Sequence, residues 1–238
     1  MKSLLALTLA VLALTACGGG ESPRLTVFAA ASLTEVLQGL EPDARYNFAG
    51  SDELATQLRE GARADVYAAA SPKYPDQLAD EGIVEKPEIF ATNRLVIIVP
   101  SANPAHIRSL VDLERKGVKL VIGAEGVPIG DYTRQVLEKA GRSGVLDRVV
   151  SEEEDVKGVL GKVALGEADA GIVYVTDAKA VGSHVRAIEL PAAAQATVRY
   201  PVAVVSGSKR KSEARRFVAL LRGERGRQAL RKAGFGLP

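Results

Sequence analysis

The sequence predicts an α/β protein in which short buried strands alternate with helices over almost the whole chain. Its 238 residues are 47% hydrophobic and 25% charged, which are ordinary globular proportions and exclude a disordered, collagen-like or coiled-coil chain. A chain of this length forms one large domain or two small lobes. Helices between the strands favour mostly parallel sheets flanked by helices, because parallel neighbours need a crossover connection.

The strands are predicted from short runs of apolar and β-branched residues that end at polar residues or glycine. The run LVIIVP at 95–100 is an example: it is too short to span a membrane and apolar enough for a buried strand. In chain order, the predicted strands cover residues 25–30, 45–49, 64–69, 94–99, 119–123, 170–174, 185–190 and 196–205.

The helices are predicted from N-terminal signals and from apolar spacing. Ser32 is a favourable N-cap, and Glu35 three residues later completes a capping box. Ser51 is followed in the first turn by Asp52 and Glu53, where the helix dipole favours acidic residues. In chain order, the predicted helices cover residues 32–40, 51–60, 72–80, 129–140, 153–165, 212–222 and 224–233.

Residues 1–17 form a targeting segment and not part of the fold. Lys2 precedes an apolar run of signal-peptide length, and the following LTAC, which ends at Cys17, resembles a bacterial lipobox. The single cysteine of the chain lies at this position. We therefore expect a signal peptide over 1–16, lipidation of Cys17, a tether over 17–23, and an extracytoplasmic protein anchored to the cell membrane. A plain secretory signal with an incidental cysteine is the alternative.

Any two lobes must be joined by ordered strands, because no Gly/Ser-rich linker occurs after residue 20. Two extended segments, near 92–96 and near 199–202, are candidates for the crossings. The expected division places residues 24–93 together with 202–238 in lobe I, and residues 94–201 in lobe II.

The residues offer little support for an enzyme. No nucleophile elbow, P-loop, dinucleotide-binding glycine motif or zinc-protease motif occurs. His106 and His184, the only histidines, lie in predicted loops away from a candidate nucleophile. The acidic run 152–155 is either a ligand set for a hard cation or a solvated helix N-terminus, and the second is the commoner case. We expect no catalytic residue and no cofactor.

Two serines directly follow predicted strands at the point where a helix begins. Ser32 follows AAA and Ser51 follows AG, and such small residues let the backbone approach a ligand closely. A helix N-terminus offers unpaired N–H groups and a positive dipole end, and a serine hydroxyl adds a donor. Two such ends facing one cleft would bind a tetrahedral oxyanion. On spacing alone, two ordinary N-caps are the commoner outcome.

Six segments in register resemble the molybdate-binding proteins of ATP-driven (ABC) molybdate importers. Each segment alone is a weak signal, but together they span nearly all of residues 24–238. The segments are VFAAASL (27–33), FAGS (48–51), GARADVY (61–67), VPIGDY (127–132), EDVK (154–157) and GIVYVTDA (171–178).

This resemblance implies a two-lobed, type II-like periplasmic-binding-protein fold that closes on a buried molybdate, with tungstate bound similarly. Ser32 and Ser51 would donate hydroxyl and backbone N–H groups, Ile129 and Val156 would donate backbone N–H groups, and Tyr174 would donate its phenol. The metal would be bound as its oxyanion, without a direct protein ligand. The implied partners are an ABC transporter permease and the membrane that holds the lipid anchor, with no nucleic acid. We expect a monomer.

Other functions stay open at this point. Sulfate, phosphate or ferric ion could be the ligand on the same fold, and Tyr132, Tyr174 and Tyr200 could gather around ferric ion. An extracytoplasmic hydrolase using Ser32 is less favoured, because it needs a base within hydrogen-bond reach. The chain departs from the family at Asp52, an acid that we expect to point outward because it would repel a dianion.

Charge is unevenly distributed, although the chain sums to only +2. Residues 209–232 hold ten Lys or Arg and two Glu, which gives this segment +8. The simpler interpretation is solvated helix faces with Phe217, Leu220 and Leu221 turned inward. The alternative is contact with anionic lipid head groups beside the anchor. The acidic run 152–155 also leaves direct carboxylate coordination of the metal open.

Overall fold

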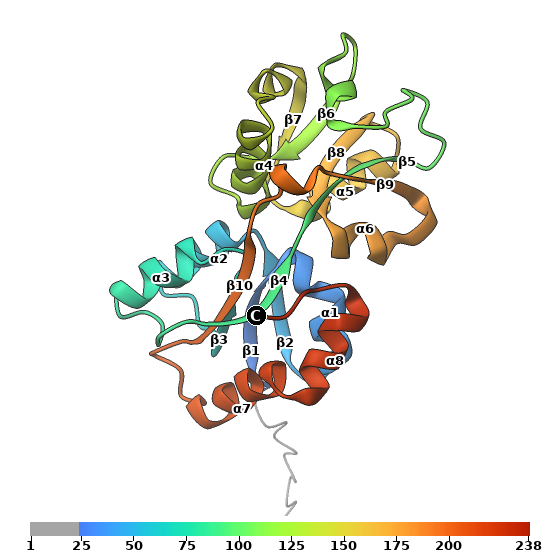
Figure 1. Cartoon of the computed structure of the whole chain (residues 1–238). Helices are drawn as coiled ribbons and strands as arrows, with labels where there is room; N and C mark the ends of the chain where they lie inside the picture. Colours follow the sequence, from blue (N-terminus) through green and yellow to red (C-terminus); the bar gives the residue numbers. More distant parts are fainter. Residues whose placement is uncertain (1–23) are drawn as a thin grey trace, which may run out of the picture.

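The computed structural model describes residues 24–238, so the predicted signal peptide (1–16), Cys17 and the predicted tether lie outside the described residues. Two five-stranded sheets, each covered by helices, lie one above the other in Figure 1 and are joined by two extended crossings. The predicted α/β class is confirmed.

The first sheet contains β1 (Thr26–Ala30), β2 (Arg45–Ala49), β3 (Val66–Ala68), β4 (Glu88–Asn93) and β10 (Val198–Val204). Their spatial order is β2-β1-β3-β10-β4. β2 and β3 pair in parallel with β1, whereas β10 pairs antiparallel with β3 and β4. The sheet is therefore mixed, with β10 running against the other four strands.

The second sheet contains β5 (Leu95–Pro100), β6 (Leu120–Gly123), β7 (Val149–Glu153), β8 (Ala170–Tyr174) and β9 (Val185–Glu189). Their spatial order is β7-β6-β8-β5-β9. β6 pairs in parallel with β7 and β8, whereas β5 pairs antiparallel with β8 and β9. β5 therefore runs antiparallel to the other four strands, as β10 does in the first sheet, and the two sheets share this topology.

Helices cover both faces of each sheet. They are α1 (Thr34–Leu40), α2 (Ser51–Arg59), α3 (Lys73–Asp80), α4 (Pro128–Lys139), α5 (Val156–Ala164), α6 (Val175–Val181), α7 (Lys211–Arg222) and α8 (Glu224–Ala233). Short 3-10 turns lie at Ala31–Leu33, Leu110–Glu114, Ser143–Arg148, Gly182–His184 and Ala192–Ala194. On the first sheet, α2 and α3 bury a separate apolar cluster that includes Leu54, Leu58 and Leu78, while α1, α7 and α8 pack on the other face.

The chain crosses between the sheets twice. Asn93 ends β4 and Leu95 begins β5, so the first crossing takes a single residue. The second lies between the end of β9 and Val198, which begins β10 and pairs with Asn93. β10 begins four residues before the expected boundary at 202, and the division into lobes at the stated residues stays a prediction. Below, lobe I means the first sheet with its helices and lobe II the second.

The sequence does not predict β4, β7 or α6. Glu152 and Glu153 belong to β7, an edge strand, so the prediction of a helix from residue 153 is wrong and α5 begins only at Val156. The predicted capping box at Ser32 is also wrong, because Ala30 is the cap residue and no side chain caps that turn. An acidic run is compatible with an edge strand because such a strand has one solvated side.

The basic C-terminal segment forms α7 and α8. Phe217 and Leu221 are buried and Leu220 is half-buried, while Arg215 pairs with Glu85 at 2.9 Å. These contacts agree with solvated helix faces, and contact with lipid stays untested. Across residues 24–238, no helix combines the length and the apolarity needed to cross a membrane.

Candidate functional site

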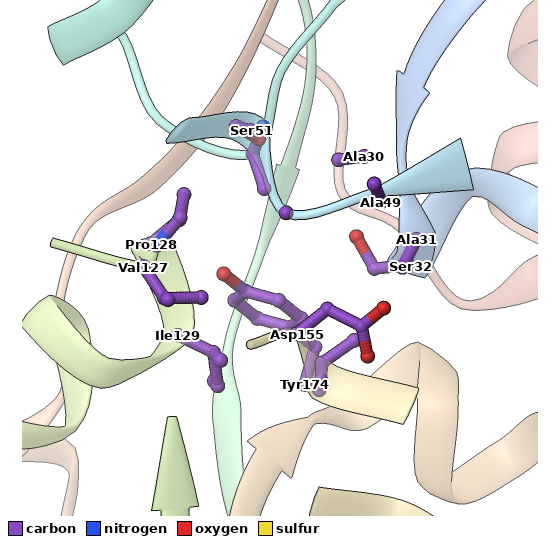
Figure 2. A pocket seen from close by; sticks show the side chains of 13 residues that line it. Ala30, Ala31, Ser32, Ala49, Ser51, Val127, Pro128, Ile129, Asp155 and Tyr174 are labelled. Atoms are coloured by element: carbon purple, nitrogen blue, oxygen red, sulfur yellow. Dashed lines mark hydrogen bonds between the residues drawn. The ribbon is translucent and has the colours of Figure 1, made fainter. Parts of the chain in front are cut away.

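A small cavity lies between the lobes at the point where several helices begin (Figure 2). Its volume is about 20 Å³. One water needs roughly 10–15 Å³, so the cavity suits a small ion and not an organic molecule such as a sugar. All five residues that the sequence singled out line it, namely Ser32, Ser51, Ile129, Val156 and Tyr174.

Ser32 lies in the 3-10 turn that follows β1. Its side chain is buried, and its Oγ lies 3.0 Å from the hydroxyl of Tyr200, with either oxygen able to donate. Ala30, in the cap position, makes no side-chain hydrogen bond. Ser32 is therefore not an N-cap, and the first N–H groups of the turn have no side chain to satisfy them.

Ser51 is the first residue of α2, after Gly50 in the cap position. Its Oγ accepts a 3.0 Å hydrogen bond from the N–H of Ala70, and its carbonyl accepts a 2.6 Å bond from the hydroxyl of Tyr67. These bonds fix the start of α2 against the end of β3. Because glycine has no side chain that could cap the helix, the first N–H groups of α2 stay uncapped at the cavity.

Ile129 reaches the cavity at the start of α4. Val127 is the cap residue and makes no side-chain hydrogen bond, and Pro128 occupies the first helical position. Proline has no N–H, so Ile129 carries the first N–H group of this helix. A residue with an apolar side chain can therefore present a polar donor to the cavity.

Val156 reaches the cavity at the start of α5. Asp155 caps this helix by accepting hydrogen bonds of 2.7 Å and 2.9 Å from the N–H groups of Lys157 and Gly158. The Asp155 side chain thus binds the second and third N–H groups of the helix, and the first N–H group, that of Val156, is not bound by this cap.

Tyr174 ends β8 and is the cap residue of α6. Its hydroxyl is buried and has no hydrogen-bond partner among the described residues. Figure 2 shows this hydroxyl pointing into the space between the lobes. Burial holds the pKa of the phenol well above its ordinary value, so the group is a neutral donor. An unpaired buried hydroxyl is costly, and a ligand oxygen in the cavity would remove that cost.

The cavity is built without a positive side chain. Among the described residues that line it, Asp155 is the one charged group, and its carboxylate caps α5. An anion here would be held by N–H groups, hydroxyls and helix dipoles. Asp52 does not line the cavity, but its Oδ1 is buried and unpaired, and burial raises its pKa. The expectation that Asp52 points outward is therefore wrong in part.

The lobes touch on one rim of the cavity through α3 and α4. Lys73 Nζ lies 3.2 Å from Asp131 Oδ2, and the Tyr74 hydroxyl donates a 2.5 Å hydrogen bond to the carbonyl of Gly126. A second contact joins Lys157 Nζ of lobe II to Glu35 Oε1 of lobe I at 2.8 Å. The structure is thus that of a protein whose lobes are closed on the cavity.

Gly50 makes this closure possible. A Cβ placed on it would lie 2.6 Å from the backbone carbonyl oxygen of Glu154 in lobe II, closer than real Cβ contacts allow. Only glycine permits the two backbones to approach in this way.

The arrangement lacks the parts of an active site or a metal centre. Within residues 24–238, no three His, Cys, Asp or Glu gather as a metal site. Neither His106 nor His184 lines the cavity, and the partner of the Ser32 hydroxyl is a phenol. A hydrolytic serine needs a base within reach. Of the three tyrosines considered for ferric ion, only Tyr174 lines the cavity.

The sequence reasoning missed three residues that shape the site: Gly50, Val127 and Asp155. Each holds a helix cap position beside the cavity. The signal for Asp155 was local, because an aspartate before an apolar helical run is a common N-cap. Gly50 and Val127 gave no such signal, because their role is to leave a helix end uncapped.

Residues 25–236 match the family model of bacterial extracellular solute-binding proteins. The molybdate-binding protein ModA of Mycobacterium tuberculosis H37Rv is 41% identical over 224 residues, covering 90% of this chain and 85% of the relative. The molybdate-binding protein ModA of Escherichia coli K12 is 31% identical over 231 residues, covering 89% and 88%. Among solved structures, the periplasmic molybdate-binding protein of Azotobacter vinelandii matches with a TM-score of 0.79 at 20% identity, covering 90% of this chain and 100% of that one. At that identity, the structural likeness shows a shared fold.

Proposed function

The chain belongs to the bacterial extracellular solute-binding proteins, and we propose that it binds molybdate, and tungstate in the same manner, for delivery to an ABC importer. It is a binding protein and not an enzyme, and molybdate is its cargo and not a cofactor. The observation that carries this proposal is the small cavity between uncapped helix starts of the two lobes.

The chemistry of the donors fits a tetrahedral dianion. Helix N-termini stabilise negative charge without a counter-ion, and hydrogen bonds to an ionised partner are about twice as strong as neutral ones. The donors come from both lobes, so they can bind oxygens on opposite sides of one anion. A cavity of about 20 Å³ leaves no room for a larger organic anion.

We assign the ligand set to both lobes. From lobe I, Ser32 and Ser51 donate hydroxyl and backbone N–H groups to the oxyanion. From lobe II, Ile129 and Val156 donate backbone N–H groups, and Tyr174 donates its buried phenol. The metal keeps its four oxygens, and no protein atom enters its coordination sphere.

This ligand set favours lobe closure by binding. Neither lobe alone offers enough donors for the anion, so the closed arrangement is stabilised when both lobes bind the same ligand. The permease would then distinguish loaded from empty protein by its shape. We further propose that Cys17 carries the lipid anchor, that the protein lies on the outer side of the cell membrane as a monomer, and that its transport partner is an ABC permease.

The alternatives are weaker on specific grounds. Sulfate is a smaller tetrahedron, and a fixed cavity would leave its oxygens short of some donors. Protonated phosphate would set an O–H group against a donor. Ferric ion would need several anionic ligands, and the cavity lining holds one carboxylate and one tyrosine.

A thermal-shift panel on the mature protein tests this function. A tight ligand stabilises by RT ln(1 + [L]/Kd), about 4 kcal/mol at a thousandfold excess over Kd. Molybdate and tungstate should each raise the melting temperature strongly, and sulfate, phosphate and Fe³⁺ far less. An equal shift with millimolar sulfate would end the claim of specificity, and no shift with molybdate would end the proposed function.

A further inference from the structure

Three charged side chains lie on helices whose starts border the anion cavity and have no role in the ligand set. Lys157 follows Val156 in the first turn of α5. Its Nζ lies 2.8 Å from Glu35 Oε1, on α1 of lobe I, and 3.2 Å from Asp177 Oδ1, on α6 of lobe II. The Glu35–Lys157–Asp177 cluster therefore spans the two lobes beside the ligand.

Asp177 is the unusual member of this cluster. Its side chain has 0% exposed surface, Oδ2 has no hydrogen-bond partner among the described residues, and Oδ1 faces only the Lys157 ammonium. A buried ionised carboxylate ordinarily has several such bonds. Lys157 at 3.2 Å is its counter-charge, and Lys157 is shared with Glu35. The negative charge of Asp177 is thus poorly compensated.

The groups around Asp177 act on it in opposite directions. Burial raises the pKa of Asp177 to about 6, the Lys157 ammonium lowers it, and the carboxylates of Glu35 and Asp155 raise it. The phenols of Tyr174 and Tyr200 share this interior and stay protonated, because burial holds their pKa values well above the ordinary value.

A bound dianion would add to the uncompensated negative charge around Asp177. It adds two negative charges beside Tyr174, the residue that caps the helix carrying Asp177. Three carboxylates and one ammonium already lie there. Like charge at short range in a buried site favours the neutral form of a carboxyl. Of these three carboxyls, Asp177 is the one that is fully buried, whereas Glu35 is 54% exposed and Asp155 accepts two N–H hydrogen bonds.

We propose that molybdate binding is linked to one proton: as the dianion enters, the Asp177 carboxylate takes a proton from solvent and becomes a neutral carboxyl. The charge of Lys157 is then left to Glu35 of lobe I, which strengthens the contact between the lobes. This inference rests on the proposed function. It assigns Asp177 as a positioning residue that acts through Lys157, not as a ligand.

The affinity for molybdate is therefore expected to fall as the pH rises. The dianion raises the pKa of Asp177 above its value in the empty closed protein, which is about 6. At a pH below the pKa values of Asp177 in both the empty and the loaded protein, Asp177 is already neutral and binding is tightest. Between them, binding takes up a proton and affinity falls as pH rises. Above both, the carboxylate stays charged and binding is weakest.

Calorimetric titration of micromolar molybdate into the full mature protein tests this directly. Titrations at pH 7 in buffers of different ionisation enthalpy measure the protons taken up per anion. We expect a substantial fraction of one proton for the wild type, with a Kd that rises roughly fivefold from pH 6 to pH 8, as a rise of the pKa by about one unit on binding gives. Asp177→Asn should bind without proton uptake and with a Kd that is flat in pH.

Asp131→Asn is the matched control, because Asp131 likewise pairs with a lysine, Lys73 of the other lobe, but its side chain is 28% exposed whereas that of Asp177 is fully buried. Its proton uptake should equal that of the wild type. Binding of molybdate with no proton uptake by the wild type overturns the inference, even if Asp177→Asn fails to fold, as does equal uptake by Asp177→Asn. Absence of any molybdate binding would instead contradict the proposed function.

Discussion

The two walls of the cavity are built from different chemistry. The lobe I wall presents two serine hydroxyls, each already held by a hydrogen bond, to Tyr200 for Ser32 and to Ala70 for Ser51. On the lobe II wall, apolar Ile129 and Val156 stand at helix starts, so the polar groups they offer are backbone N–H groups. The lobe I wall depends on the identity of its side chains, whereas the lobe II wall, apart from the Tyr174 phenol, depends on backbone geometry.

The two kinds of hydrogen-bond donor respond differently to substitution. A serine can be replaced by alanine and its donor is lost. An N–H group at a helix start survives any substitution except proline. At Ile129 and Val156, binding is therefore sensitive to the position of the backbone, whereas at Ser32 and Ser51 it is sensitive to the loss of one hydroxyl oxygen. The following substitutions test the contrast, from the largest expected effect on binding to the smallest.

Gly50→Ala should abolish tight binding by holding the walls apart. The new Cβ would lie 2.6 Å from the carbonyl oxygen of Glu154, and backbone cannot move aside as a side chain can. We expect molybdate affinity to fall roughly a hundredfold or more, about 3 kcal/mol. Titration calorimetry measures the loss. Gly39→Ala on α1, where a Cβ meets nothing within 4 Å, is the control and should bind normally. Normal binding by Gly50→Ala would show that the lobes need not approach this closely.

Ser32→Ala and Ser51→Ala should each weaken molybdate binding by about 1.5–3 kcal/mol, the scale of a hydrogen bond to a charged partner. The backbone N–H groups of both residues remain, so binding should be reduced and not lost. Comparing the dissociation constants of the two variants with the wild type checks this. An unchanged affinity for either variant removes that hydroxyl from the ligand set.

Tyr174→Phe should weaken molybdate binding by about 1.5–3 kcal/mol and leave the empty protein as stable as before. The hydroxyl has no partner within the described residues, so its removal costs the empty protein no hydrogen bond. Melting curves without ligand, together with calorimetric titrations, separate the two effects. A lower melting temperature of the empty variant with unchanged affinity would make Tyr174 a packing residue only.

Ile129→Ala and Val156→Ala should have the smallest effect on affinity, below about 1 kcal/mol, because the donor N–H groups stay in place. Both side chains are buried, so the free energy of unfolding should fall by roughly 1–4 kcal/mol. Chemical denaturation and calorimetric titration measure these two quantities. Losses of affinity as large as those of the serine variants would contradict the assignment of backbone donors on the lobe II wall.

Much of the fold could be predicted from local pattern, and the exceptions have physical causes. β2, β8 and α8 begin and end where their apolar spacing indicated. β7 was missed because its acidic residues suggested a helix start, whereas an edge strand tolerates them on its solvated side. α6 was missed because it begins directly after β8, with Tyr174 ending one and capping the other. No glycine, proline or common N-cap residue separates the strand from the helix.

The site could be predicted only with the help of a resemblance. Spacing alone treated Ser32 and Ser51 as helix caps, whereas the structure places Ala30 and Gly50 in those positions. Nothing in the composition of Ile129 or Val156 indicates a polar role, because their contribution is the backbone. In the Glu35–Lys157–Asp177 cluster, Glu35 lies 122 positions from Lys157 in the chain, so the cluster could only be seen after the lobes were assembled.

A crystal structure of the protein with molybdate tests the central claim most directly. The claim is that an intact tetrahedral oxyanion is held by both walls through hydrogen bonds alone. The account predicts one metal between the lobes, with its oxygens within hydrogen-bond distance of the Ser32 and Ser51 hydroxyls, the Ile129 and Val156 N–H groups and the Tyr174 phenol. An anion held by one lobe only, or an oxygen of Asp155 bound to the metal, would contradict it.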